Sequence, residues 1–243
     1  MAPKAPHEAL PQPLRTCEGL GVLHLFYRVN LNVWRARTSD ERAVALDYLE
    51  TLLTTARQQP QTQILTLAMF TRADLGFIII TPDFHDLNAL EKSITSSLGP
   101  DVLSPRFTYL SLTDKTDYGP DKTTPKSRLE PTLPNWEYVC FYPLTEKRGI
   151  DFSSANKRSA GIPGQLRVEA AHAGRVRQIV TVSSGLDDWA CGVTLFAHDP
   201  LDLKAVVQER TNLAHHDSSR LGPMHNGLPL PLKTIYRRVL LVV

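Results

Sequence analysis

Histidines and paired carboxylates are the side chains in this sequence whose types and spacing could do chemistry. His215 and His216 are adjacent, and His225 follows them. The group resembles a metal site in number only, because its spacing is not that of a zinc site, no cysteine is near, and adjacent side chains on a helix point apart. Asp187 and Asp188 could do acid–base work, but they lie in a predicted turn, where aspartates usually bond to the turn's own backbone. Neither group predicts a metal or catalytic site.

The composition limits the classes of function. The 243 residues are 42% hydrophobic and 21% charged, which is typical of a globular protein with a substantial core. The net charge is only +2 and the basic residues are scattered, so we expect no nucleic-acid partner. Cys17, Cys140 and Cys191 are too few and too dispersed for a disulfide framework, which favours a reducing, cytoplasmic location. Two of them lie in apolar runs, where cysteine is usually buried.

The elements that would position a site begin after a tail. Residues 1–18 are rich in proline without an apolar segment, which predicts a flexible tail and neither a signal peptide nor a membrane span. Residues 19–113 predict the order strand, helix, strand, strand, helix, strand, as in a ferredoxin-like unit. Thr38 and Glu41 have the spacing of a capping box for the first helix, and Asp83 can cap the second. The apolar stripe of the first helix is predicted to be Val44, Tyr48, Leu49, Leu52 and Leu53.

The second half repeats this order. Residues 114–134 are rich in Pro, Lys, Asp and Thr and predict a linker. Residues 135–227 predict a strand, a short helix, a β-hairpin and a helix that carries Leu203, Val206 and Val207. We therefore predict an α+β protein of two tandem ferredoxin-like (βαββαβ) domains with facing antiparallel sheets, a dimeric α+β barrel. Residues 228–243 predict a C-terminal tail whose apolar end is a strand at a subunit contact.

Two segments carry a resemblance to a known family. They are NWEYVCFYPLTEKR, residues 135–148, and QIVTVSSGLDDWACGVTLFAHDPLDLK, residues 178–204. On these segments the chain resembles the chlorite dismutase family, and within it the coproheme decarboxylases of bacterial haem synthesis, over about residues 19–227. The resemblance implies ring-shaped oligomers, often pentamers, and a haem or iron coproporphyrin III held in the C-terminal domain.

The resemblance also implies roles for single residues. In the family's decarboxylases, peroxide oxidises the bound iron porphyrin, and a tyrosine that matches Tyr142 passes a radical to a propionate, which loses carbon dioxide. The family's distal glutamine matches Gln178. A propionate-binding arginine matches Arg128, and a guanidinium fits a carboxylate bidentately. The family's lysine falls on Glu146, so Lys147 would have to take over that contact.

The chain departs from the family at the iron. The family's proximal histidine matches Gln165, and a neutral amide is a poor ligand for haem iron. His172 lies on the same predicted helical face two turns along, roughly 10 Å away, so the porphyrin would have to move bodily to reach it. We interpret His172 as a helix-end residue, with iron ligation as the less favoured alternative. The serine and arginine of the family's last helix find no clear match between Arg210 and Arg220.

Three functions stay open on the sequence. The first is a pseudoenzyme, a non-catalytic or weakly haem-binding subunit in a homo- or hetero-oligomer with an active paralogue. The second is an active peroxide-dependent coproheme decarboxylase, an oxidoreductase with Gln165, water or His172 at the iron and with Tyr142 and Gln178 as catalytic residues. The third is a non-haem ferredoxin-like binding module, for which RNA is disfavoured because no strand alternates aromatic and basic residues. The loss of the iron ligand and of propionate contacts favours the first.

Overall fold

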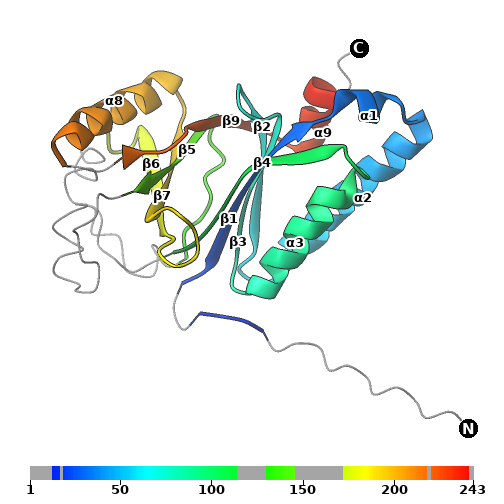
Figure 1. Cartoon of the computed structure of the whole chain (residues 1–243), viewed down its shortest axis with the longest axis horizontal. Helices are drawn as coiled ribbons and strands as arrows, with labels where there is room; N and C mark the ends of the chain where they lie inside the picture. The colour runs from blue at the N-terminus through cyan, green and yellow to red at the C-terminus, as the bar shows by residue number, and fades with distance from the viewer. Residues whose placement is uncertain (1–12, 17–18, 114–129, 146–171, 218–219, 241–243) are drawn as a thin grey trace, which may run out of the picture.

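The computed structural model describes residues 13–16, 19–113, 130–145, 172–217 and 220–240, with the backbone alone for residues 212–217. The elements in chain order are β1 (Gly21–Val29), α1 (Leu31–Arg35), α2 (Ser39–Arg57), β2 (Gln63–Met69), β3 (Leu75–Thr81), α3 (Phe84–Ser97), β4 (Leu103–Thr113), β5 (Tyr138–Thr145), β6 (Val176–Val182), β7 (Cys191–Ala197), α8 (Pro200–Asp217), β8 (Arg220–Leu221), β9 (His225–Pro229), α9 (Leu232–Ile235) and the π-helix η1 (Tyr236–Leu240). Figure 1 shows α8 on one side of the strands and α2 and α3 on the other. Within these ranges no helix is long and apolar enough to cross a membrane.

Local sequence signals set the ends of the first helices. The Thr38 hydroxyl accepts a hydrogen bond from the Glu41 N–H, and the Glu41 carboxylate accepts one from the Thr38 N–H, so a capping box begins α2. Asp83 accepts a hydrogen bond from the His85 N–H at the start of α3. Gly99 follows the end of α3 with a φ of 92°, which favours glycine. The predicted N-termini of α2 and α3 are confirmed.

The strands form one closed antiparallel sheet. Their order is β7-β6-β4-β1-β3-β2-β9-β5-β8, and β5 also pairs with β7, which closes the sheet. On one side β9 joins the halves, because Gly227 pairs with both Met69 of β2 and Val139 of β5. On the other side β4 pairs with β6. The predicted α+β barrel is confirmed, and its division into two tandem ferredoxin-like units stays a prediction.

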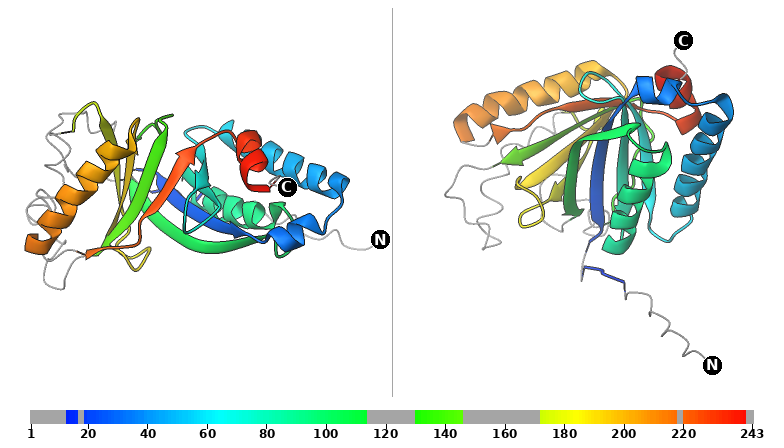
Figure 2. Two further views of the ribbon diagram at one scale, coloured as in Figure 1. Left: turned by 90° about the horizontal axis from the view of Figure 1, so that it is seen from above. Right: turned by 45° about the vertical axis from the view of Figure 1, so that its right-hand side comes forward.

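Three apolar cores fill the layers of the barrel. One lies between the sheet and helices α2, α3 and α9 and includes Leu49 and Ile94. A second lies inside the closed sheet, where Phe26 of the first half meets Phe141 of the second. The third lies between α8 and the strands β5, β6 and β7. The left view of Figure 2 shows α8, the two halves of the sheet and the remaining helices as successive layers.

The C-terminal segment differs in part from the prediction. The residues after β9 form α9 and then η1, and η1 includes Val239 and Leu240, the start of the apolar end that the sequence predicted as a strand. A subunit contact of this segment stays a prediction. Ile235, Tyr236 and Leu240 are buried in the core that α2 and α3 also cover. These apolar side chains find their partners within the same chain, which explains why residues 232–240 are not a strand. Residues 241–243 lie outside the described residues.

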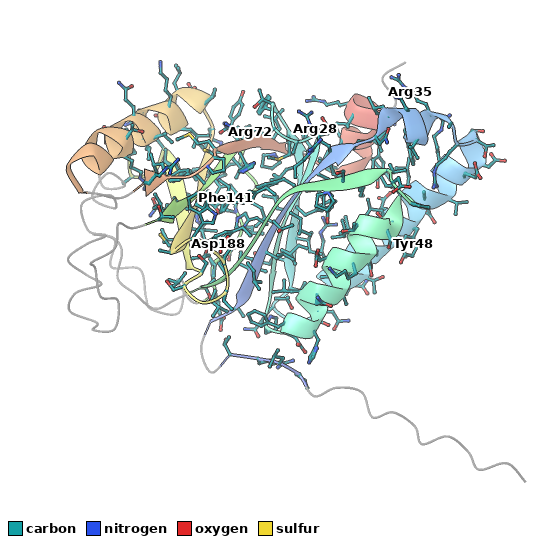
Figure 3. All side chains as sticks on the ribbon, viewed as in Figure 1. Arg28, Arg35, Tyr48, Arg72, Phe141 and Asp188 are labelled. Carbon is teal, nitrogen blue, oxygen red and sulfur yellow. The ribbon has the colours of Figure 1, made fainter. Side chains whose placement is uncertain are left out.

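The apolar stripe predicted on α2 is partly wrong. Leu49 and Leu53 are fully buried, but Val44 is 71% exposed and Tyr48 is 51% exposed. Figure 3 shows Tyr48 at the outer side of the helical layer. The five predicted positions span a wide arc of the helix, and the sheet covers only the part of that arc that Leu49 and Leu53 occupy.

Leu49→Ala should lower the free energy of unfolding by about 2–5 kcal/mol, because it leaves a cavity between α2 and the sheet. Val44→Ala removes apolar atoms from the same helix at an exposed position and should change that free energy by less than about 0.5 kcal/mol. Denaturation with guanidinium chloride measures both values. A loss for Val44→Ala as large as for Leu49→Ala would contradict the exposure of Val44.

Two histidines lie inside the closed sheet. The Nε2 atom of His24 lies 3.0 Å from the Thr194 hydroxyl, and its ring stacks on Phe141 with the centroids 4.0 Å apart. His225 is also buried, and neither of its ring nitrogens has a hydrogen-bond partner among the described residues. Burial and the neighbouring His225 lower the pKa of His24 from 6.5 to about 3. Burial and the charge of Arg72 lower the pKa of His225 to about 4.

We expect these histidines to make the fold sensitive to acid. Because both pKa values are lower in the folded state, the unfolded chain takes up protons first as the pH falls. Their stabilising effect is complete above about pH 6.5 and is lost as the pH falls toward about 4 for His225 and about 3 for His24. At about 1.4 kcal/mol per pKa unit, the free energy of unfolding falls by on the order of 5 kcal/mol through His24 alone.

Unfolding free energies across this pH range measure the effect. His24→Gln should reduce by about one the number of protons that the chain takes up on unfolding, so the free energy of unfolding should depend less steeply on pH. The control is His85→Gln, since His85 is exposed on α3. An equally steep dependence in His24→Gln and in the wild type would rule out this role for His24.

Candidate functional site

Tyr142 lies in the middle of β5, beneath α8. It pairs with Val193 of β7, and its side chain is fully buried. The alternation of the strand brings Cys140 and Leu144 to the same core. Burial raises the pKa of Tyr142 to about 12, although the neighbouring Arg210 cation acts in the opposite direction. The phenol therefore holds its proton at neutral pH.

Arg210 is the buried cation of the site. Leu203 and Val206 of α8 pack in the core over β5, β6 and β7, and Arg210 follows Val206 by about one helical turn. Its side chain is only 2% exposed. In the part of the chain that the structure describes, its Nε has no hydrogen-bond partner and no carboxylate pairs with its guanidinium. Among the described residues, the site thus contains a buried positive charge without an anion.

Gln178 of β6 completes the group. Arg210 donates one hydrogen bond from Nη1 to the Tyr142 hydroxyl and another from Nη2 to Oε1 of Gln178. The guanidinium carbon also lies 6.0 Å from the centroid of the Tyr142 ring. The structure therefore brings together two residues that the family resemblance singled out, through a third that the sequence analysis missed. A usable signal was present, since an arginine stood seven residues after Leu203 on an otherwise apolar helical face.

His172 has contacts on both ring nitrogens. Its Nε2 lies 3.2 Å from the Glu209 carboxylate, and Nη2 of Arg175 lies 3.2 Å from its Nδ1. A guanidinium only donates hydrogen bonds, so Nδ1 accepts and Nε2 carries the hydrogen toward Glu209. Arg175 also bonds Asp202 of α8 at 2.8 Å. Iron ligation by His172 would require one of these contacts to break, and its role stays a prediction.

The other predicted site residues are not brought to the group by the described structure. Arg128, Lys147 and Gln165 lie outside the described residues. His215 and His216 lie in α8 where only the backbone is described. In the described ranges, no three potential ligands among His, Cys, Asp and Glu are grouped to hold a metal.

The loop between β6 and β7 is held by its own polar groups. Asp187 accepts hydrogen bonds from the Asp188 N–H at 2.8 Å and from the Leu110 N–H of β4 at 3.4 Å. Ser183 accepts one from the buried Tyr109 hydroxyl at 2.7 Å. The interpretation of Asp187 as a turn residue is confirmed. Figure 3 shows Asp188 in this loop.

A cavity of about 680 Å³ opens beside α8. Phe70, Tyr138, Val207 and Met224 are among the residues that line it. Neither Arg210 nor its two acceptors belong to the lining, so we place the candidate site at Arg210 and not in this cavity.

Comparison with known proteins gives consistent matches. The model of the family "Chlorite dismutase" matches residues 42–228. A coproheme decarboxylase of Oceanobacillus iheyensis is 30% identical over 215 residues, which cover 80% of this chain and 84% of that protein. One of Staphylococcus saprophyticus is 31% identical over 216 residues, which cover 82% and 87%.

Two solved structures support the same fold. A heme-binding protein from Thermus thermophilus has a TM-score of 0.79 at 26% identity, covering 95% of this chain and 98% of that chain. A mutant chlorite dismutase from Candidatus Nitrospira defluvii has a TM-score of 0.76 and covers 92% of this chain and 97% of its own. Because the second is only 15% identical, it bears on the fold alone.

Tyr142 should titrate with a pKa near 12, because its burial outweighs the effect of the neighbouring cation. The measurement is the absorbance of phenolate as the pH rises, taken as the difference between the wild type and Tyr142→Phe so that other tyrosines cancel. Titration of Tyr142 near pH 10, the ordinary value for a tyrosine, would show that water reaches its hydroxyl.

Proposed function

Because the chain belongs to the chlorite dismutase family, we propose that it holds iron coproporphyrin by the carboxylates, binds the iron weakly and is not itself catalytic. The observation that carries this proposal is the buried guanidinium of Arg210 without a carboxylate partner in the described structure. A buried cation is costly unless an anion pairs with it. Relatives named coproheme decarboxylase and heme-binding protein point to a porphyrin carboxylate as that anion.

The residues present fit the carboxylates of such a ligand. A guanidinium has five N–H donors, of which the contacts to Tyr142 and Gln178 use two, and its planar fork matches a carboxylate. Arg128 and Lys147 are the further cationic residues that we propose for the other carboxylates. When bound, an iron porphyrin would supply oxidation by peroxide. Tyr142 holds a neutral phenol beside Arg210, so it could release a hydrogen only toward a neighbouring acceptor.

The residues fit the iron less well. Gln165 stands where the family resemblance places the proximal histidine, and carboxamides are not among the usual ligands of haem iron. His172 is held by Glu209 and Arg175. We therefore propose a weakly haem-binding subunit that assembles with an active paralogue in a ring. Two ferredoxin-like domains, residues 19–113 and 135–227, would form its framework.

An active coproheme decarboxylase is the second candidate function. The specific observation in its favour is that Tyr142 and Gln178, the two residues that the resemblance makes catalytic, lie in one hydrogen-bonded group. Water, Gln165 or His172 would then serve as a ligand of the iron. No contact in the described site specifically favours a non-haem binding module.

Titration with ferric coproporphyrin III, followed by the Soret absorbance, separates these functions. We expect no tight binding by the wild type and no loss of carbon dioxide on addition of peroxide. Gln165→His should restore tight binding, because imidazole is a strong ligand for haem iron. Sub-micromolar binding and decarboxylation by the wild type would refute the non-catalytic proposal and support the active enzyme.

The contribution of Arg210 is best measured in the Gln165→His background. Adding Arg210→Gln should weaken binding roughly 10- to 100-fold, because a hydrogen bond to a charged group contributes about 1.5–3 kcal/mol. Arg177→Gln is the matched control, since Arg177 precedes Gln178 on β6 but is exposed. Equal affinities for the two double variants would remove Arg210 from the binding site.

A further inference from the structure

The contacts of Arg210 fix the direction of two other polar groups. A guanidinium has no acceptor, so both of its contacts in the site must be donations. The Tyr142 hydroxyl oxygen accepts one, so the hydroxyl hydrogen has to point elsewhere. Oε1 of Gln178 accepts the other, so the NH₂ group at the far end of the amide points away from the guanidinium.

We propose that Arg210 is a positioning residue that turns the hydroxyl hydrogen of Tyr142 and the NH₂ group of Gln178 away from its own guanidinium, as donors toward a ligand. With the unused N–H groups of Arg210, the site then presents hydrogen-bond donors, and it selects ligands with an oxygen anion. The identity of that ligand as a porphyrin carboxylate rests on the proposed function. The orientation of the donors is a property of the ligand-free chain.

The neighbouring carboxylates leave the guanidinium free for this role. Glu209 precedes Arg210 on α8, but its carboxylate lies 3.2 Å from His172. Asp202 bonds Arg175 at 2.8 Å. Neither carboxylate therefore neutralises Arg210 or competes with the two neutral oxygens for its N–H groups.

Arginine suits the position better than lysine. Tyr142 and Gln178 lie on different strands, and the two terminal nitrogens of one planar group reach both oxygens together. An ammonium group keeps the charge but lacks the fixed fork. Arg210→Lys should therefore separate the effect of geometry from the effect of charge.

The test uses the full-length protein without ligand, so it does not depend on porphyrin binding. The NH₂ group of Gln178 is followed by NMR in protein with isotope-labelled glutamine, and Tyr142 by the phenolate difference titration. Arg210→Lys should shift the Gln178 resonances, because one nitrogen cannot hold both oxygens in the native geometry. Arg210→Met should shift them too and should raise the pKa of Tyr142 further, because the neighbouring cation lowers it in the wild type.

Arg177→Met is the matched control, because it removes a charge beside Gln178 from an exposed position and should leave both signals unchanged. The proposal is wrong if Arg210→Lys and Arg210→Met keep the native circular dichroism and both signals stay as in the wild type. If the signals move but even Gln165→His fails to bind iron coproporphyrin, the proposed function fails and the positioning role stands.

Discussion

A positive charge buried between a helix and a sheet is the constraint on which the site depends. Moving an ion out of water costs several kcal/mol, and in the described structure Arg210 meets two neutral oxygens and no carboxylate. Neutral acceptors compensate that cost only in part. The described residues therefore leave the charge of Arg210 without a neutralising partner, and an anion beside it would gain more than at an exposed arginine.

The closed sheet makes this arrangement possible. Tyr142 and Gln178 lie on β5 and β6, which both pair with β7, so the two acceptors stand on one rigid surface at a fixed separation. On the inner side of the same sheet, Gly192 of β7 leaves room for the ring of Tyr109, since an added Cβ would lie 2.5 Å from that ring. The packing inside the barrel thus holds in place the strands that present the site outside it.

The sequence predicted what local chemistry determines and missed what depends on contacts between distant segments. The capping box at Thr38, the cap at Asp83 and the hairpin after β6 follow from neighbouring residues, and all three are present. The exposure of Val44 depends on how far the sheet extends under α2. The π-helix at the C-terminus depends on a core built by the other end of the chain.

The site shows the same division. Tyr142 and Gln178 were found through family resemblance, but the residue that joins them was not, because an arginine on a helix is solvated by default and its place on the apolar face of α8 does not reveal its partners. Its acceptors lie 68 and 32 residues away in the sequence. The contacts of His172 with Glu209 and Arg175 could not be predicted without the fold either, although they determine which nitrogen of its ring carries the hydrogen.

The same group also explains how a tyrosine could be kept without catalysis. If Tyr142 lost its hydroxyl, Arg210 would retain a single acceptor in the described site, and an underpaired buried charge is strongly destabilising. The phenol thus has a structural reason to persist that is independent of radical chemistry. An iron ligand has no such support, because it would contribute to the fold only when metal is bound. A chain could therefore lose an iron ligand and still retain Tyr142, so the presence of this tyrosine is by itself weak evidence for an active enzyme.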